Sequence, residues 1–372
     1  MGDFGAERAF FVDGVERGAR NPLVIAELGT SHGGDLSKAM DMAAAAAEAG
    51  ADCVKVQMVL ADEILHPNTG EVPLPGGIIR LYDVFRGLES PPEFYAAVKE
   101  RVEALGLLFL CTPFGLESAR MLGELRPKAV KIASPELNFT DLLRSVAGWG
   151  LPALLSTGVS TLGDIEEALA ALGARRACLL HCVTAYPAPE EDYNLRVLGS
   201  LSAVFGVPAG VSDHSLDPEL VPALAVAQGA AAVEKHFCLS RDDPGLDDPI
   251  ALPPREFARM AAAVRAAAAA GPGETIEALG RERGREKVEA VLGSGVKALA
   301  PSERENYSRT NRSLHALRDI QPGQAIGPGD FAALRTEKIL RPGLPPSWAG
   351  RVLGRTARQL IPAGEGIRFE DV

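Results

Sequence analysis

Eight short apolar runs recur along the sequence, separated by amphipathic stretches rich in Ala, Leu and Glu. Continuous apolar runs of this length, alternating with helical stretches, are typical of parallel strands that are buried on both faces. The polar residues that close successive runs are mostly 19 to 31 residues apart, and one βα unit of an eight-fold barrel takes about 31 residues. The runs lie at residues 22–28, 51–57, 105–112, 128–134, 151–157, 176–182, 208–214 and 230–237.

This pattern predicts an α/β protein with a (β/α)8 TIM barrel. Eight units at nearly even spacing suit a closed sheet, and a doubly wound open sheet is the alternative architecture. The one wide spacing, between residues 55 and 112, contains the Pro- and Gly-rich insertion HPNTGEVPLPGG at 66–77. An insertion of this composition predicts a loop over the mouth of the barrel.

The composition changes from Ala-rich to polar near residue 285. We therefore predict a barrel domain at 1–285, a linker at 286–311 and a small C-terminal domain at 312–372. The last domain contains a weak internal repeat, DIQPGQAIGPGDF and LIPAGEGIRFEDV, which predicts two related β-turn-β units. Because so short a segment cannot enclose a large core, we expect it to dock on the barrel or on a partner chain.

The overall composition excludes several classes of partner. A formal net charge of −11 makes nucleic acid and anionic membranes unexpected partners. The five cysteines form no CxxC motif and have apolar neighbours, which is typical of reduced thiols in a cytoplasmic protein. The start of the chain has no long apolar stretch, so we expect no signal peptide and a cytoplasmic location.

Ionisable or hydroxyl side chains close the apolar runs, where a barrel carries its catalytic groups. The last run ends in Glu234, Lys235 and His236, and the run before it ends in Ser212, Asp213 and His214. The residues that close the eight runs are Glu27, Lys55, Thr112, Lys131, Ser156, His181, Ser212 and His236.

Two of these groups suggest a metal. His214 and His236 end neighbouring strands, and two imidazoles at that separation can reach one divalent cation such as Mn, Fe, Co or Zn. The alternative is that each histidine is a hydrogen-bonded structural residue.

Two lysines suggest an anion site. Lys55 and Lys131 converge on one mouth with the hydroxyls of Thr112, Ser134 and Ser156, which predicts a pocket for phosphate and carboxylate groups.

The lysines also allow two other interpretations. Each lysine can instead pair with a nearby acid such as Glu27 or Glu136, or one of them can form a Schiff base. Glu27 and Glu136 are the candidate general acid or base groups.

A series of sequence blocks also resembles a known family. The blocks are IAELGTSHGGDLSKA, DCVKVQ, CTPF, VKIASPE, LLSTGVSTLGDIEEAL, HCVTAYPAPEEDYNLR, GVSDHS, VEKHF, DDPGLDDPIAL and NRSL. In this order, over residues 20–372, they resemble the sialic acid synthase family of nonulosonate synthases. The tail resembles the antifreeze-like (SAF) domain of the same enzymes.

The resemblance implies an enzyme that condenses phosphoenolpyruvate with the open-chain form of N-acetylmannosamine or a related N-acetylated amino sugar. It implies a divalent metal on His214 and His236, most often Mn, with Mg or Co as alternatives. It also implies a domain-swapped homodimer in which Arg312 reaches the site of the other subunit. Phosphoenolpyruvate contacts are implied at Lys55, Thr112, Lys131, Ser134, Ser156 and Ser212, and sugar contacts at Gln57, Tyr186 and Asp247.

Within this reaction we assign the water proton to Glu136 and place Glu27 near the metal-side water. The chain departs from the family pattern at TSHGG (30–34), at Thr184 and at Asn311, which leaves the identity of the sugar open. Two further hypotheses are a class I Schiff-base aldolase acting on sialic-acid-like sugars and a non-catalytic sugar-binding barrel. The intact set of Lys, Glu and His residues favours an enzyme.

Overall fold

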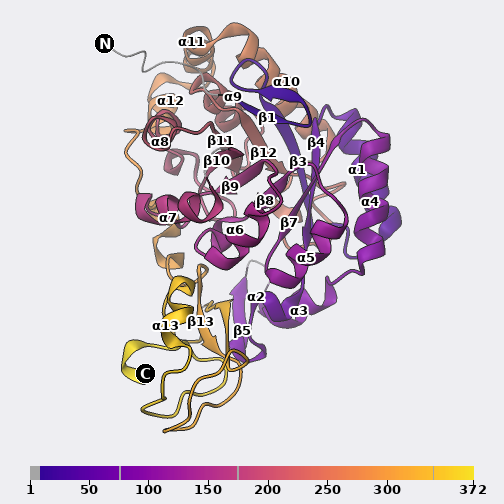
Figure 1. Cartoon of the computed structure of the whole chain (residues 1–372). Helices are drawn as coiled ribbons and strands as arrows, with labels where there is room; N and C mark the ends of the chain where they lie inside the picture. The colour runs from indigo at the N-terminus through magenta and orange to yellow at the C-terminus, as the bar shows by residue number, and fades with distance from the viewer. Residues whose placement is uncertain (1–8, 75–76, 174–175, 338) are drawn as a thin grey trace.

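Eight parallel strands form the centre of the protein (Figure 1). The computed structural model describes residues 9–74, 77–173, 176–337 and 339–372, so the first eight residues, which enter the signal-peptide prediction, lie outside it. Each of the eight apolar runs contains one of the central strands. They are β3 (Leu23–Gly29), β4 (Cys53–Met58), β7 (Leu108–Pro113), β8 (Val130–Ile132), β9 (Ala153–Ser156), β10 (Ala177–Cys182), β11 (Ala209–Asp213) and β12 (Ala232–His236).

The order of the strands confirms the barrel and excludes the open doubly wound sheet. The sheet runs β7-β4-β3-β12-β11-β10-β9-β8. Strand β12, the last central strand along the chain, pairs with β3, the first, and His236 lies opposite Glu27. The two ends of this order, β7 and β8, lie side by side and complete the circle. All the strands are parallel, so their carboxyl ends meet at one mouth.

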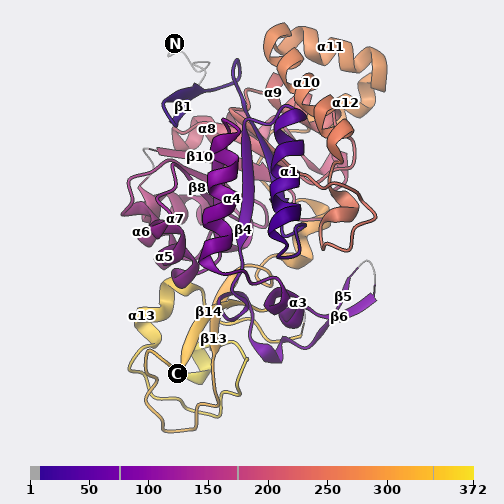
Figure 2. The ribbon, with the colours of Figure 1, turned by 90° about the vertical axis from the view of Figure 1, so that its right-hand side faces the viewer.

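Helices surround the barrel, and their sequence patterns explain how they pack. In α1 the residues Ala39, Met42, Ala43 and Ala46 are buried, which is the spacing of one helical face. Figure 2 shows α1 beside α4 on the outside of the sheet. The surrounding helices are α1 (Leu36–Glu48), α4 (Pro92–Ala104), α5 (Leu116–Glu124), α6 (Thr140–Ala147), α7 (Leu162–Leu172), α8 (Val197–Phe205), α9 (Leu220–Ala227), α10 (Pro254–Ala270), α11 (Pro272–Arg283) and α12 (Arg285–Leu292). No described helix is long and apolar enough to cross a bilayer.

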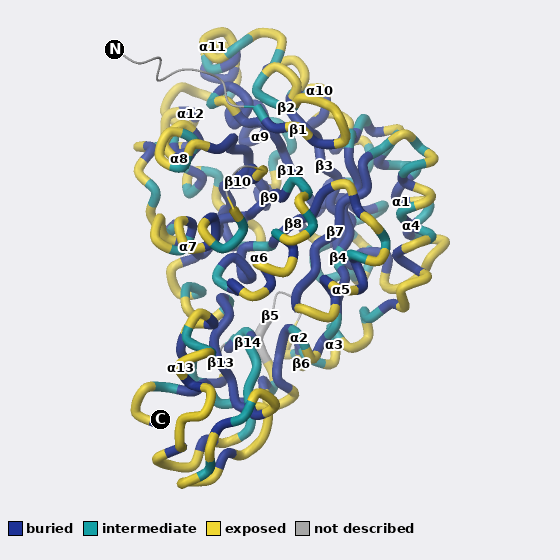
Figure 3. The backbone as a smooth tube through the Cα atoms, viewed as in Figure 1, coloured by how far each residue is buried: buried dark blue, intermediate teal, exposed yellow. Residues whose placement is uncertain are grey.

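The inside of the barrel is apolar at one end and polar at the other. At the amino ends of the strands, Leu23, Cys53 and Leu108 belong to one buried apolar cluster. A hairpin of β1 (Phe10–Val12) and β2 (Val15–Arg17) adds Phe10 and Val12 to this cluster. In Figure 3 the central strands are coloured as buried along their lengths. Access to the interior is therefore confined to the carboxyl end, where the polar residues lie.

The insertion between β4 and β7 forms regular elements. They are α2 (Ala61–Ile64), η1 (Pro67–Thr69), β5 (Glu71–Leu74), β6 (Gly77–Arg80) and α3 (Leu81–Gly87). The expected loop at 66–77, of which 75–76 lie outside the described residues, is largely the β5–β6 hairpin, which projects away from the barrel in Figure 2. Helix α3 instead brings Phe85 to the cavity at the barrel mouth.

The segment 286–311 first completes α12, whose Val288 and Val291 belong to the main core, and then runs beside the barrel through η6 (Pro301–Asn306). The tail has a small core of its own. The two repeated segments pair with each other at Ile320 and Ile361. Its elements are β13 (Arg312–Ala316), β14 (Phe331–Arg335), η7 (Pro346–Trp348), α13 (Ala349–Val352) and η8 (Phe369–Asp371).

Gly210 in β11 gives a test of the barrel packing. A Cβ at this position would overlap the carbonyl oxygen of Ala232 on β12. We expect Gly210→Ala to lower the free energy of unfolding by about 1–3 kcal/mol, because backbone atoms have to move apart. The matched control is Gly199→Ala in α8, where a Cβ meets no described atom within 4 Å. It should raise stability by up to about 1 kcal/mol. Urea denaturation measures both, and a Gly210→Ala protein as stable as wild type would contradict this packing.

Candidate active site

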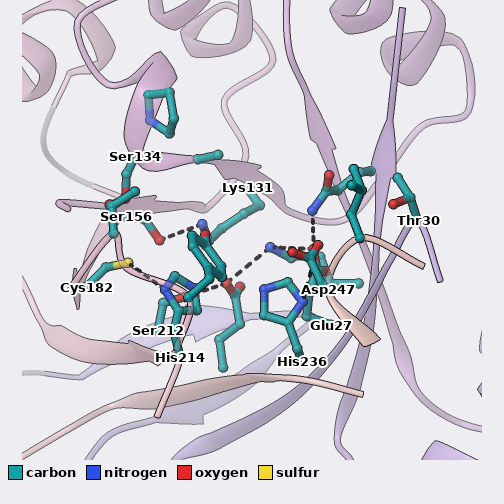
Figure 4. A pocket seen from close by; sticks show the side chains of 18 of the residues that line it. Glu27, Thr30, Lys131, Ser134, Ser156, Cys182, Ser212, His214, His236 and Asp247 are labelled. Atoms are coloured by element: carbon teal, nitrogen blue, oxygen red, sulfur yellow. Dashed lines mark hydrogen bonds and ion pairs between the residues drawn. The ribbon is translucent and has the colours of Figure 1, made fainter. Parts of the chain in front are cut away.

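A cavity of about 210 Å³ opens at the carboxyl ends of the strands (Figure 4). Eleven of the residues that were given a role from the sequence line it: Glu27, Lys55, Gln57, Lys131, Ser134, Ser156, Tyr186, Ser212, His214, His236 and Asp247. Thr112, Glu136 and Arg312 are buried but are not among the described lining residues. His181 faces away from the cavity, and its Nε2 lies 2.6 Å from the carbonyl oxygen of Tyr193.

The alternation of side chains along β12 explains its cluster of charged residues. Successive residues of a strand point to opposite faces. Glu234 and His236 therefore point into the barrel and line the cavity. Lys235 points outward, where its Nζ lies 2.6 Å from Oδ2 of Asp213 in a fully buried ion pair. The ion pair of Lys235 and Asp213 stabilises the junction of β11 and β12. Glu234 and His236 belong to the site.

Glu234 lies at the centre of the site. Its Oε1 accepts a hydrogen bond from the Ser212 hydroxyl at 2.8 Å. The same oxygen is 3.1 Å from Nζ of Lys55 and 3.8 Å from Nζ of Lys131. Burial acts to raise the pKa of Glu234, but the two lysines outweigh it and lower the pKa to about 2. The sequence prediction gave Glu234 no role, although its two-residue spacing from His236 indicates a shared face.

Glu27 forms the second acidic contact of Lys55. Its Oε1 is 3.3 Å from Nζ of Lys55 and accepts a hydrogen bond from Nε2 of Gln57 at 2.7 Å. Burial disfavours the Lys55 ammonium, but Glu234 and Glu27 together raise its pKa above the usual value. Oε2 of Glu27 is buried and has no hydrogen-bond partner among the described residues. Of the two carboxylate oxygens of Glu27, Oε2 is therefore the one free to accept a hydrogen bond.

Lys131 has a different environment. Its Nζ donates to Oγ of Ser156 at 2.7 Å and to the carbonyl oxygen of Ile132 at 3.1 Å. Burial lowers the pKa of Lys131 to about 8, with the positive charge of Lys55 acting in the same direction and Glu234 opposing it. Near neutral pH the ammonium form still predominates, and it can bind an anion in the cavity.

Two imidazoles line the same cavity as the lysines. The rings of His214 and His236 lie 5.4 Å apart, and Tyr186 stacks on His214 at 4.2 Å. Nδ1 of His214 is 2.8 Å from the carbonyl oxygen of Val183, so this nitrogen carries the proton and Nε2 keeps its lone pair. Burial lowers the pKa of both histidines. His236 has Oδ2 of Asp247 at 3.8 Å from Nδ1.

These donors suit a divalent metal. Neutral imidazole is the form of histidine that binds metals, and a carbonyl bond to the other ring nitrogen commonly orients such a ligand. Among the described residues, no group of three or more His, Cys, Asp and Glu side chains is arranged to hold an ion. A metal here would therefore have His214 and His236 as its protein ligands. Metal binding stays a prediction.

The tail reaches the cavity through an arginine that the sequence prediction did not select. Arg335 lines the cavity, and its Nη2 lies 2.8 Å from Oε1 of Glu136. Arg312 contacts the same carboxylate oxygen, also at 2.8 Å, and donates to the carbonyl oxygen of Phe114. The guanidinium of Arg312 thus binds barrel groups where the tail docks, whereas Arg335 is the tail residue that lines the cavity.

Comparison with known proteins decides the family. The sequence profile of the NeuB family matches residues 42–275, and that of the SAF domain matches residues 311–372. The chain belongs to the NeuB family. The resemblance to sialic acid synthases and the C-terminal SAF domain are both confirmed, and so is the prediction of an enzyme of this type.

Three relatives of this NeuB family member are informative. The spore coat polysaccharide biosynthesis protein SpsE of Bacillus subtilis is 34% identical over 94% of this chain and 93% of its own. Its crystal structure has a TM-score of 0.81, covering 98% of this chain and 99% of that one. The N,N'-diacetyllegionaminic acid synthase of Campylobacter jejuni is 32% identical, covering 85% and 91%.

The third relative is known from a crystal structure. The N-acetylneuraminic acid synthetase of Leptospira borgpetersenii, in complex with citrate, is 31% identical. It covers 81% of this chain and 95% of its own, with a TM-score of 0.64.

The lowered pKa of Lys131 predicts pH-dependent anion binding. Since its pKa falls from 10.5 to about 8, the cation is lost as the pH rises through about 8. The affinity for sulfate, whose own charge is constant over this range, should then fall by up to about tenfold per pH unit. Isothermal titration calorimetry measures this. Lys131→Met should bind sulfate weakly with no such dependence, and a flat wild-type profile would refute the role of Lys131.

Proposed function

We propose that the chain condenses phosphoenolpyruvate with the open-chain aldehyde of an N-acetylated amino sugar, giving a sialic-acid-like nonulosonate and phosphate. The observation that carries this proposal is that two lysines on Glu234 and two neutral imidazoles line one cavity. One side suits an anion and the other suits a carbonyl oxygen with its metal. Relatives named as synthases of legionaminic acid and N-acetylneuraminic acid support the same chemistry.

Phosphoenolpyruvate would lie against the lysine side of the cavity. In Figure 4, Ser134, Ser156 and Cys182 line one side of the site, with Lys131 beside them. The ammonium of Lys131 and the hydroxyls of Ser134 and Ser156 would hold the phosphate and carboxylate groups. Lys55 and Ser212, both bound to Glu234, would complete this half. The contribution of Thr112, which lies outside the described lining, stays a prediction.

The amino sugar would occupy the opposite half, where Gln57, Tyr186 and Asp247 line the cavity. Arg335 supplies donors there that suit the amide oxygen or a hydroxyl of the sugar. The relatives are named as synthases of different acids, so the acceptor is proposed as a class: N-acetylmannosamine, its phosphate or a related 6-deoxy diamino sugar.

The proposed reaction uses these groups as follows. Carbon 3 of phosphoenolpyruvate attacks the aldehyde carbon and a C–C bond forms. The π electron pair of the aldehyde moves to its oxygen, which takes up a proton to become a hydroxyl, and positive charge develops at carbon 2. Water adds at carbon 2, and the C–O bond to phosphate breaks. The Lys55 and Lys131 ammonium groups stabilise the charge of the phosphate and carboxylate. A divalent metal, Mn or else Mg or Co, held by His214 and His236, would supply Lewis acidity at the aldehyde oxygen.

Proton transfer belongs to the carboxylates. Glu27 lines the cavity and has a buried oxygen without a described partner, so it can accept a proton from water. Glu136 lies outside the described lining and binds two arginines, and its assignment to the water proton stays a prediction.

In the single chain the tail lies on its own barrel, and exchange of tails in a homodimer stays a prediction, as does a cytoplasmic location.

Phosphate release tests the proposed reaction. Protein mixed with phosphoenolpyruvate, Mn and a panel of N-acetylated hexosamines should release phosphate with at least one sugar and not without sugar. Lys131→Met should lower kcat/KM for phosphoenolpyruvate about ten- to a hundredfold, because a charge-assisted contact is lost. No release with any sugar would contradict the proposal. Borohydride trapping with pyruvate in the same preparation would instead identify a Schiff-base aldolase, and sugar binding with neither reaction would identify a non-catalytic barrel.

Removal of one imidazole tests the metal site. His236→Ala should weaken Mn binding by at least about tenfold, since one of two protein ligands is lost. Equilibrium dialysis of the purified protein against Mn measures this without substrate. Chelation should also abolish phosphate release, and Mn or Co should restore it. His181→Ala is the matched control, because this histidine faces away from the cavity. Equal Mn affinity in His236→Ala and wild type would exclude the site.

A further inference from the structure

We propose that residues 297–311, here called the strap, fix the positions of two active-site loops relative to each other. Glu303 is the positioning residue for phosphoenolpyruvate binding. This inference rests on the proposed function. The strap joins the barrel to the tail and passes beside the mouth. It contacts the loop that follows β9 and the loop that follows β10.

The first loop contains a strained residue that the strap holds on both sides. Val159 has a φ of 42°, a left-handed conformation that is an outlier for a β-branched side chain. Its N–H donates to Oε2 of Glu303 at 2.9 Å. Its carbonyl oxygen accepts from Nδ2 of Asn311 at 3.0 Å. A strained backbone persists where its surroundings fix it, and here both of its polar groups are bound by the strap.

The second loop is held in the same way. The N–H of Thr184 donates to Oε2 of Glu303 at 2.9 Å, and its carbonyl oxygen accepts from Nδ2 of Asn306 at 3.2 Å. One carboxylate oxygen therefore receives the N–H groups of both loops. Glu303 is 1% exposed, so these bonds are shielded from water. Its other oxygen accepts from the N–H of Ala300 at 3.1 Å.

The two loops shape the phosphate side of the cavity. Gly158 of the first loop packs against the second loop, and a Cβ there would overlap the hydroxyl of Thr184. The N–H of Gly158 donates to Oγ of Ser134 at 3.0 Å, and Ser156, two residues earlier, accepts from Lys131. A shift of either loop would therefore move the hydroxyls that face the Lys131 ammonium. Such a shift affects the anion more than the sugar. Of the four proposed sugar contacts, Tyr186 alone lies on a held loop, and Gln57, Asp247 and Arg335 lie on other elements.

The strap also carries a cation to the same loop. Nζ of Lys297 donates to the carbonyl oxygen of Thr157 at 2.9 Å. Burial lowers the pKa of Lys297, and the negative charge of Glu303 is the largest effect opposing this shift. Lys297 and Glu303 thus act as a pair, one binding a carbonyl and the other binding amide groups of the same turn.

Hydrogen exchange and kinetics of Glu303→Ala test the inference. Exchange of the Val159 and Thr184 amides should be faster, read by mass spectrometry on peptides covering these loops. The value of kcat/KM for phosphoenolpyruvate should fall about ten- to a hundredfold, and KM for the amino sugar should change by less than about threefold. Glu303→Gln keeps an acceptor oxygen and should recover most of the loss.

Asp371→Ala is the matched control, since Asp371 is also a buried carboxylate that accepts a backbone N–H, but within the tail. It should leave exchange at both loops and kcat/KM unchanged. Unchanged exchange in folded Glu303→Ala would overturn the strap, whether or not the proposed reaction occurs. Faster exchange with unchanged kcat/KM for phosphoenolpyruvate would overturn the positioning role. If Glu303→Ala does not fold, Asn306→Ala and Asn311→Ala each remove one donor and carry the same test.

Discussion

The site depends on one buried carboxylate that holds two ammonium groups together. Without Glu234, Lys55 and Lys131 would be like charges in a water-poor cavity, where their repulsion and their desolvation both favour loss of a proton. With Glu234 in place, Lys55 keeps its proton firmly, and Lys131 keeps its proton near neutral pH. The barrel makes this possible because it closes β12 against β3 and brings the two lysine strands to the same mouth as Glu234.

The barrel and most of the site could be predicted from the sequence because both follow local rules. Buried parallel strands give continuous apolar runs, and a polar residue near the end of a run marks the carboxyl end of the strand, as with Lys55 and His236. Glu234 was within reach of the same rule, since it lies two residues before His236. The rule also selected His181, which follows an apolar run but faces Tyr193 outside the cavity, because position in a run does not fix the face.

Contacts made by the linker and the tail could not be predicted in this way. Arg335 and Glu303 lie more than a hundred residues after the strands that they approach, and no periodicity relates them. Their positions depend on how the tail docks, which is a tertiary event. Arg312 is a further example. The motif that identifies it is local, but its burial against Glu136 depends on a contact between distant parts of the chain. The same carboxylate binds both arginines, so docking of the tail and the shape of the mouth are energetically linked.

The route of residues 293–311 has an evolutionary consequence. A small domain at the end of a chain is usually easy to exchange, because boundaries between domains carry few contacts. Here the connection itself binds two barrel loops through Glu303, Asn306 and Asn311. Recombination that replaced the SAF domain together with this connection would leave Val159 and Thr184 with unpaired backbone groups. The barrel, the connection and the SAF domain are therefore expected to be inherited as one unit, with lineages diverging by substitution and not by domain exchange.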